Sequence, residues 1–218
     1  SSDVCSSDLG KVTLEVMDEA LLANDKPSGH GGRENDWYSC SIRSRALCLL
    51  DPYVDEVGTR QVLMTSVTAP LLDQGTLLGM VGVDISLATL QSLVEEMDKT
   101  LYDGQGKVLL LSHEGRVAGV EGFKVALGDT LDQQGLSTDL NGWLAKGEVV
   151  TRWSPDGALL QTFVPVSMRG TDRQWGIYIE LPRAVVLASA LQLQDELETQ
   201  SQRSVATQLL IEIGRAHV

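Results

Sequence analysis

Alternating apolar and polar positions predict a first β-sheet in the N-terminal half of the chain. Its expected strands are residues 44–50, 62–67 and 77–83. The last two would form a β-hairpin, because Gly75 lies between them and suits a tight turn. From Ser86 onward, apolar residues recur at helical spacing, which predicts an amphipathic helix that covers this sheet. The apolar positions of the helix are Leu87, Leu90, Val94 and Met97.

Two segments precede this sheet. Residues 11–22 are apolar at intervals and could form a strand followed by a helical turn. Residues 24–35 contain a proline and three glycines, which predicts a loop. The loop could cover a pocket, or it could be an ordinary surface connection.

The pattern restarts after a polar, glycine-containing stretch at residues 98–106, which indicates a boundary between two modules. Five further strands are expected at residues 108–112, 117–120, 148–153, 158–166 and 174–181. Residues 127–145 are polar with scattered apolar positions and predict helical turns. The second module would therefore be a five-stranded antiparallel sheet with little helix of its own.

Residues 182–211 predict one long helix, which starts at a proline, a residue favoured in the first helical turn. The apolar face of this helix ends near Leu197. Beyond it the same face carries the polar residues Gln200 and Ser204, as expected for a connector that projects from a domain. Apolar residues return at 209–211, where we expect a transmembrane helix of the parent protein to begin.

The two ends of the chain are interpreted as sequencing-adapter scars. Residues 3–9 and 212–218 can be back-translated into two DNA strings that are reverse complements of each other. A sequencing adapter read in frame would produce this pair, so residues 1–9 and 212–218 are excluded from the expected fold. The native fragment would then be residues 10–211.

The charge of this fragment argues against polyanionic partners. The whole chain has 218 residues and a net charge of −13, and residues 10–211 carry 16 basic and 27 acidic side chains, which gives −11. Such an acidic surface repels nucleic acid and anionic lipid headgroups. The sequence also has no run of 18 apolar residues, the length that a membrane-spanning helix needs.

Cys40 and Cys48 are the cysteines that remain in the fragment. Two cysteines do not identify a redox compartment. They could pair in an oxidising environment, but we favour two small buried thiols, because free cysteine is among the most buried residue types.

Aromatic and acidic residues between positions 36 and 84 provide the parts of a binding site for a cation. They are Asp36, Trp37, Tyr38, Tyr53, Asp55 and Asp84. An ammonium over an aromatic face gains about 0.5–2 kcal/mol per contact, and a buried carboxylate opposite it adds charge-assisted hydrogen bonds. Two such contacts and two or three charged hydrogen bonds would reach the roughly 8 kcal/mol that micromolar affinity needs.

Each of these residues also has an ordinary structural explanation. The aromatic pair could belong to the core. Asp84 could cap the helix that follows it, because aspartate is favoured at that position. Tyr53 and Asp55 could be turn residues after the preceding proline, and Asp36 could be a solvated loop charge.

Motifs for catalysis and for metal binding are missing from the sequence. His30 and His113 lie in expected loops without a partner at metal-ligand spacing. Gly104 and Gly106 precede an expected strand rather than a helix, unlike a phosphate-binding loop. No nucleophile lies in a familiar catalytic motif. We therefore expect neither an enzyme nor a cofactor, and a purely structural or partner-binding module stays open as an alternative.

The order of the aromatic and acidic residues resembles the double Cache (dCache) sensor domain of bacterial chemoreceptors, in the branch that senses amino acids and amines. Trp37 and Tyr38 match the aromatic pair of that family. Tyr53 and Asp55 match its Tyr-x-Asp motif, and Asp84 matches an aspartate at a strand end, in the sequence Gly-x-Asp-Ile-Ser-Leu. The resemblance implies that the last three hold the amino group of the ligand.

The resemblance covers nearly all of the native fragment and implies an α+β fold with two PAS-like Cache modules, each an antiparallel sheet with flanking helices. Residues 10–98 would be the membrane-distal, ligand-binding module and residues 99–182 the membrane-proximal module. Residues 183–211 would be a connector helix toward a transmembrane segment. The parent protein would be a homodimeric, membrane-anchored receptor with this part in the periplasm. Its output would be a methyl-accepting chemotaxis module, a histidine kinase or a diguanylate cyclase.

One departure from the family changes the expected ligand. Members that bind amino acids carry an arginine two residues before the tryptophan, which holds the ligand carboxylate, and this chain has Asn35 there. The tyrosine expected five residues earlier is His30. An α-carboxylate would then face several acids without a fixed cation, which is costly when desolvated. We therefore expect a small cationic amine or polyamine, with an amino acid as the alternative ligand.

Overall fold

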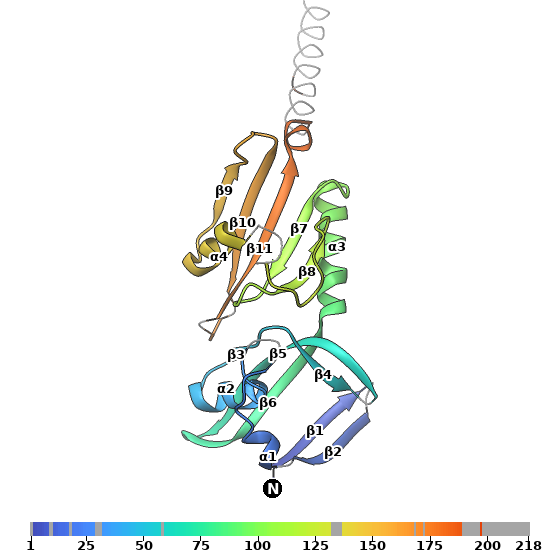
Figure 1. Ribbon diagram of the computed structural model, residues 1–218. Coiled ribbons are helices and arrows are strands. Elements are labelled where there is room, and N and C mark those ends of the chain that lie inside the picture. The colour runs from blue at the N-terminus through green and yellow to red at the C-terminus, as the bar shows by residue number, and fades with distance from the viewer. Residues whose placement is uncertain are drawn as a thin grey trace, which may run out of the picture.

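The chain folds into antiparallel sheets with helices beside them, which confirms the expected α+β class. The computed structural model describes residues 2–8, 11–17, 19–28, 32–57, 59–131, 137–167, 169–171, 173–188 and 197. A first sheet near the N-terminal end and a second, five-stranded sheet lie one beyond the other, and helix α3 passes from the first to the second (Figure 1).

The first sheet is built around one long central strand. Its strands are β3 (Cys48–Leu49), β4 (Tyr53–Val57), β5 (Arg60–Asp73) and β6 (Thr76–Ser86). Strand β5 pairs with β3 and β4 along one edge and with β6 along the other. The expected hairpin of β5 and β6 is confirmed and is longer than predicted. Its turn residues Gln74 and Gly75 both have positive φ, 46° and 84°, which matches the twist of the flanking strands.

Two expectations for the segment before β5 are wrong. Residues 44–50 do not form one strand, because helix α2 (Asp36–Ser44) occupies the start and only β3 is extended. Arg45 adopts a left-handed conformation, with a φ of 52°, and so ends the helix. The alternative that Tyr53 and Asp55 are turn residues is also wrong, because both lie in β4, whose pairing with β5 starts directly after Pro52.

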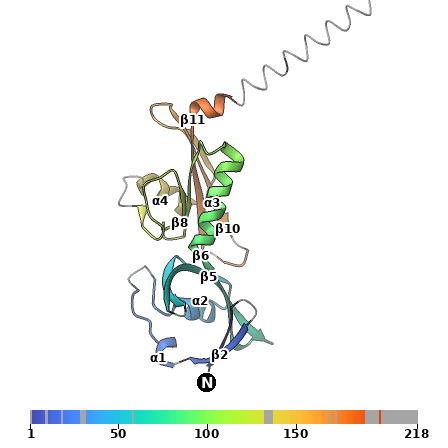
Figure 2. The ribbon, with the colours of Figure 1, turned by 90° about the vertical axis from the view of Figure 1, so that its right-hand side faces the viewer.

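Helix α2 is covalently attached to the first sheet. Cys40 of α2 and Cys48 of β3 form a disulfide, so the preferred expectation of two free thiols is wrong. The reason is that the chain reverses after α2 and brings the two Cα atoms to 6.1 Å, which their spacing in the sequence does not reveal. Cys48 is the register partner of Thr68, so α2 covers the face of the sheet from which Thr68 projects. Figure 2 shows α2 inside the curve of β5 and β6.

Helix α3 (Leu87–Tyr102) starts at the predicted place but packs on a different sheet. Its N-cap is Ser86, whose Oγ accepts a hydrogen bond from the Thr89 N–H, so the alternative that Asp84 caps this helix is wrong. The helix packs mainly on the second sheet instead of covering the first. There the Gln91 side chain exchanges hydrogen bonds of 2.7 and 2.9 Å with the backbone of Val120.

The second sheet contains all five expected strands, in the order β8-β7-β11-β10-β9. They are β7 (Lys107–Leu111), β8 (Val117–Glu121), β9 (Val150–Trp153), β10 (Leu159–Ser167) and β11 (Gln174–Pro182). Helix α4 (Ser137–Lys146) packs on β10 and β11, in the region where helical turns were predicted. The buried core between them consists of Leu109, Leu111, Val117, Leu131, Leu140, Leu144, Phe163 and Tyr178.

The two ends of the chain are described only in part. Strand β1 (Ser2–Asp8) pairs with β2 (Lys11–Met17), and α1 (Glu19–Leu22) follows, which confirms the expected strand and helical turn. The attribution of residues 1–9 to an adapter rests on the nucleotide pattern, which this pairing does not test. Residues 183–188 are helical after β11, and most of the expected connector helix and all of residues 212–218 lie outside the described residues.

None of the helices in the described residues is long and apolar enough to cross a lipid bilayer.

Polar and apolar contacts hold the two sheets together. Asp51, whose side chain is 7% exposed, accepts a hydrogen bond of 2.8 Å from the Glu114 N–H and forms an ion pair of 3.1 Å with Arg173. Glu114 and Arg173 belong to the second sheet region, whereas Asp51 directly precedes Pro52 and β4. An apolar cluster adds to this contact; its members are Leu49, Val67, Leu90, Leu110, Ala118 and Trp175.

Candidate functional site

Three side chains on one face of the first sheet form a chain of hydrogen bonds. Ser66 on β5 and Asp84 on β6 are register partners, and Tyr53 on β4 pairs with the residue two positions before Ser66. All three therefore project from the same face. Ser66 Oγ donates to Asp84 Oδ1 at 2.5 Å, and the Tyr53 hydroxyl lies 2.6 Å from Ser66 Oγ. Because the only hydroxyl hydrogen of Ser66 is used in the hydrogen bond to Asp84, Tyr53 must be the donor in its hydrogen bond with Ser66.

Tyr53 is a neutral hydrogen-bond donor in this arrangement. Burial raises the pKa of Tyr53 to about 12; the bond with Ser66 opposes the rise, and the charges of Asp84 and Asp55 add to it. The ordinary pKa of a tyrosine is about 10. The negative charge of the cluster therefore lies on carboxylates and not on a phenolate.

Asp55 and Asp84 are exposed, so the expected buried carboxylate is not found. Asp84 is exposed because it lies on β6, which among the described strands pairs only with β5 and therefore forms an open edge of the sheet. Asp55 lies two residues after Tyr53 on β4, on the same face, and its Oδ1 accepts a hydrogen bond of 2.8 Å from the Glu56 N–H. Both carboxylates keep acceptor capacity toward solvent, because each has two oxygens with several lone pairs.

Trp37 and Tyr38 lie in the first turn of α2 and are half-buried. Their ring centroids are 5.8 Å apart, with planes inclined by 54°. Because α2 packs on β5 and β6 and its disulfide reaches β3, the pair lies on the same side of the first sheet as Tyr53 and Asp84. The structure thus places rings and carboxylates on one side of one sheet.

Asp36 has protein partners of its own. Its Oδ2 accepts a hydrogen bond of 2.8 Å from the Arg33 N–H, and its Oδ1 pairs with Arg43 at 3.3 Å. Arg43 also donates to Ser39 Oγ at 2.7 Å. The charge of Asp36 is therefore balanced within α2, which leaves Asp55 and Asp84 as the acids of the cluster.

Asn35, at the position where the resembled family has an arginine, has a structural role. Its amide donates to the Leu22 carbonyl at 2.8 Å, and its Oδ1 accepts from Ser39 Oγ at 3.2 Å, which connects α1 to α2. The side chain is 5% exposed. Arg33 pairs with Asp25 at the surface, at 2.9 Å. Neither residue replaces the missing arginine.

Two residues of this region, Ser66 and Arg43, were not predicted from the sequence. Ser66 is uncharged and lies inside an apolar strand pattern, so its only signal is its register opposite Asp84. Arg43 could have been found from helical spacing, because it follows Asp36 by seven residues and Ser39 by four, which places all three on one helix face.

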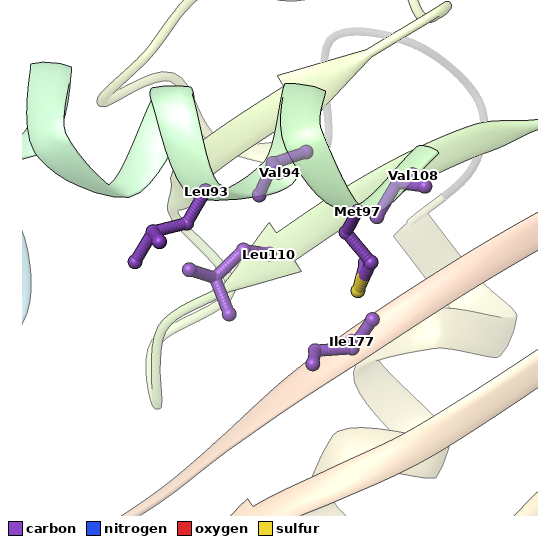
Figure 3. Close-up of a pocket in the computed structure, with 6 residues that line it drawn as sticks. All are labelled: Leu93, Val94, Met97, Val108, Leu110 and Ile177. Atoms are coloured by element: carbon purple, nitrogen blue, oxygen red, sulfur yellow. The ribbon is translucent and has the colours of Figure 1, made fainter. Parts of the chain in front are cut away.

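A small cavity of about 80 Å³ lies apart from this cluster, between α3 and the second sheet. Its lining is entirely apolar and comes from α3, β7 and β11, as Figure 3 shows. The lining residues are Leu93, Val94, Met97, Val108, Leu110 and Ile177. Because it has no polar group, the cavity suits neither an amine nor an amino acid.

Metal chemistry has no support in the described residues, where no group of three or more His, Cys, Asp or Glu side chains could hold an ion. His113 Nδ1 accepts a hydrogen bond from the Gln174 N–H at 3.4 Å. His30 lies outside the described residues.

Comparison with known proteins shows that the chain is similar to parts of bacterial chemoreceptors. Residues 12–92 match the family model of the methyl-accepting chemotaxis protein-like, first PDC sensor domain. Over 210 residues the chain is 34% identical to the methyl-accepting chemotaxis protein TlpQ of Pseudomonas aeruginosa, which covers 95% of this chain and 29% of that protein. The chain spans less than a third of the length of the curated relatives that it matches.

Solved structures give the same picture of the fold. The methyl-accepting chemotaxis protein X is similar with a TM-score of 0.58 and 25% identity, over 83% of this chain and 63% of that chain. The extracellular domain of the putative histidine kinase mmHK1S-Z3 is similar in fold, with a TM-score of 0.56 and 21% identity, over 72% of this chain and 57% of that chain. Residues 12–92 therefore match the first PDC sensor domain of methyl-accepting chemotaxis proteins, and nearly the whole chain is similar to part of one such receptor.

Proposed function

We propose that this chain is the extracytoplasmic sensor part of a membrane-anchored chemoreceptor and that it binds a small cationic amine between α2 and the first sheet. The observation that carries the proposal is the hydrogen-bonded chain of Tyr53, Ser66 and Asp84. A neutral tyrosine and a buried serine hold one oxygen of an exposed carboxylate, whose other oxygen can accept from an ammonium. The similarity to chemoreceptors supports the sensor role.

The charge at the cluster favours a cationic ligand over a zwitterion. Asp55 and Asp84 both act on Tyr53, so their fields overlap at the same place. A ligand ammonium would be attracted to both carboxylates and to the faces of Trp37 and Tyr38. Asp36 would contribute less to the attraction of a cationic ligand than its charge suggests, because the ion pair with Arg43 balances that charge. We therefore assign the main ligand contacts to Trp37, Tyr38, Tyr53, Asp55 and Asp84, with Asp36 in a supporting position.

An amino acid is the second candidate ligand, and Arg43 is the observation that favours it. Its side chain is 55% exposed and its contact with Asp36 is 3.3 Å long, so the guanidinium can also meet a ligand carboxylate. This reading fits an amino-acid sensor of a chemoreceptor, a histidine kinase or a diguanylate cyclase. It predicts that Arg43→Ala weakens binding of amino acids and leaves amine binding intact.

A thermal-shift experiment tests the proposal and separates the two ligands. Polyamines, monoamines, quaternary amines and amino acids are added to the 218-residue chain, because a ligand that binds only the folded state raises the melting temperature. An amine is expected to raise it, and Asp84→Asn is expected to abolish the rise. Asp73→Asn, an equal charge change at the exposed hairpin end, serves as the control. The amine proposal is wrong if no amine stabilises the chain.

The two sheets correspond in this proposal to two Cache modules, residues 10–98 and 99–182, with residues 183–211 as the connector toward a transmembrane segment. Ligand binding near Tyr53 would act on Asp51, two residues away, and through Arg173 on β11. Strand β11 ends at Pro182, directly before the helical residues 183–188. In a homodimeric receptor this connection would convey a small displacement to the output module.

A further inference from the structure

Strand β6 forms an edge of the first sheet whose outer side has no strand partner. Among the described strands β6 pairs only with β5, so its N–H and C=O groups that point away from β5 are not used in a sheet. The pairing with β5 is regular from Gly79 to Ser86, because the bulge beside Leu72 disturbs only the end near the hairpin turn. A long, regular and open edge is a template to which another strand can add.

The side chains of β6 are unusually exposed for a strand. Successive side chains point to opposite faces of a sheet, and yet all four residues from Val81 to Asp84 are exposed. Val81 is 52% exposed and Val83 is 62% exposed, both on the face opposite Asp84. Leu78, next to the bulge, is 69% exposed. Apolar side chains gathered along an unpaired edge indicate a surface that another protein segment covers.

Three other outer strands of the two large sheets are protected, whereas β6 is not. Strand β4 carries Asp55 and Glu56, and β9 has only four residues, one of which is Arg152. Helix α3 packs on β8. Charges, short length and a covering element are means by which proteins prevent edge-to-edge pairing. Strand β6 has eleven residues, no lysine, arginine or proline, and a single charge, Asp84 near its C-terminal end.

We propose that β6 pairs, in antiparallel direction, with β6 of a second copy of this chain, about a twofold axis at Val81. The alternation of large residues and glycines supports this register. Val83 then lies opposite the partner's Gly79, and Met80 opposite the partner's Gly82, so a large side chain meets a glycine at each position. A Cβ atom at Gly79 would meet nothing within 4 Å, which leaves room there for the partner's valine.

Charge also favours this register. Each copy has a net charge of −13, which opposes association in general. With the axis at Val81, Asp84 lies opposite the partner's Leu78, so the two Asp84 residues are about 20 Å apart along the paired strands. Exposed charges at that separation are largely screened at physiological salt. A twofold axis at Asp84 itself would instead bring the two carboxylates face to face.

The pairing continues the first sheet across the twofold axis into the second copy. It adds backbone hydrogen bonds between the two β6 strands and covers Val81 and Val83 of both copies, as in a self-complementary dimer interface. The inference does not depend on the proposed amine ligand, because the pairing uses the backbone edge and the valines of β6.

Sedimentation equilibrium of the 218-residue chain at several concentrations tests the pairing. A monomer–dimer equilibrium is expected. The dissociation constant should fall when sodium chloride is raised from about 0.1 M to about 1 M, because salt screens the repulsion between two acidic copies. In Val81→Lys two lysines face each other at the axis, so the dissociation constant should rise at least about tenfold. The melting temperature of the dilute, monomeric chain should change little, because Val81 is exposed.

Val149→Lys is the matched control. Val149 is 65% exposed and lies directly before β9, so this variant makes the same substitution beside an edge of the second sheet. It should dimerise as wild type does. The inference is overturned if wild type stays monomeric at every concentration that remains in solution, or if Val81→Lys dimerises as tightly as wild type. Loss of the dimer in Val149→Lys alone would place the interface at β9 and overturn it as well.

Amide hydrogen exchange gives a second, local measurement on the same samples. The amides of β6 should become more protected as the concentration of wild type rises, and those of Val81→Lys should not. Protection of β6 that is independent of concentration would mean that another segment of the same chain covers this edge, which contradicts pairing with a second copy.

Discussion

At the scale of single residues, the site depends on how an uncharged, fully buried serine orients an exposed acid. Ser66 accepts a hydrogen bond from Tyr53 and donates one to Asp84, so one oxygen of the Asp84 carboxylate is held in place before any ligand binds. A fixed carboxylate loses less conformational entropy on binding than a free one, which favours affinity. The charges of Asp55 and Asp84 then set the preference for a cation.

Tyr53 predicts a specific loss of stability at high pH. Its pKa in the folded chain, about 12, lies above the ordinary value of about 10, so folding favours the neutral phenol. This contribution to the free energy of unfolding is complete below about pH 10 and disappears as the pH rises to about 12. The loss is roughly 1–2 kcal/mol after allowance for partial exposure.

Urea unfolding of wild type and Tyr53→Phe at about pH 9 and about pH 11.5 measures this contribution. Wild type should lose more stability than the variant between the two conditions. Equal losses would show that Tyr53 is not the neutral, buried donor of the cluster.

The residues of the cluster were partly predictable and their contacts were not. The aromatic pair, the two acids and Tyr53 can be read from the sequence, but the partner of Asp84 cannot. A two-residue turn alone would pair Asp84 with Thr65. A bulge beside Leu72, where Leu78 has no register partner, moves the pairing by one residue, to Ser66. Because a shift of one residue reverses the face of every side chain, this local feature decides which hydroxyl meets Asp84.

At the scale of elements, α2 determines where the aromatic pair lies. The sequence of α2 is rich in serine and contains a cysteine and two aromatics, none of which favours a helix strongly. Its helical state comes from packing on β5 and β6 and from the disulfide to β3, which are contacts between distant elements. A helix stabilised in this way cannot be predicted from local pattern, whereas the β5–β6 hairpin can, because its turn residues are diagnostic.

The disulfide gives a prediction for α2. In the double variant Cys40→Ser and Cys48→Ser, the free energy of unfolding should fall by about 2–3 kcal/mol, because the unfolded chain regains the entropy of an open loop. Amine affinity should fall as well, since Trp37 and Tyr38 lose their fixed position over the sheet. Thermal melts and amine titrations with and without dithiothreitol measure both effects. Unchanged values in the reduced protein would mean that packing alone holds α2.

At the scale of the whole molecule, the two sheets are joined by a partly buried ion pair and an apolar cluster. Asp51 meets Arg173 and the Glu114 N–H close to the place where Tyr53 begins β4. The expected two-sheet division is visible in the sequence because both strand patterns are clear. The side on which α3 packs was not predictable, since its apolar stripe fits either sheet and only the tertiary contacts decide.

Asp51→Ala should destabilise the connection between the sheets. It leaves a partly buried arginine without its partner and an N–H without its acceptor, which costs roughly 2–4 kcal/mol. Scanning calorimetry should show a lower melting temperature and a broader or split transition. Asp25→Ala removes the partner of Arg33 from an exposed pair and should change little. Equal effects of the two variants would contradict a special role for Asp51.

The most direct test of the central claim is the affinity of the chain for putrescine with and without the Asp84 carboxylate. Isothermal titration of wild type, Asp73→Asn and Asp84→Asn at neutral pH measures it. Wild type and Asp73→Asn should bind with similar, roughly micromolar dissociation constants, and Asp84→Asn should bind at least about tenfold more weakly. Equal binding by Asp84→Asn would contradict a cation site built on this carboxylate.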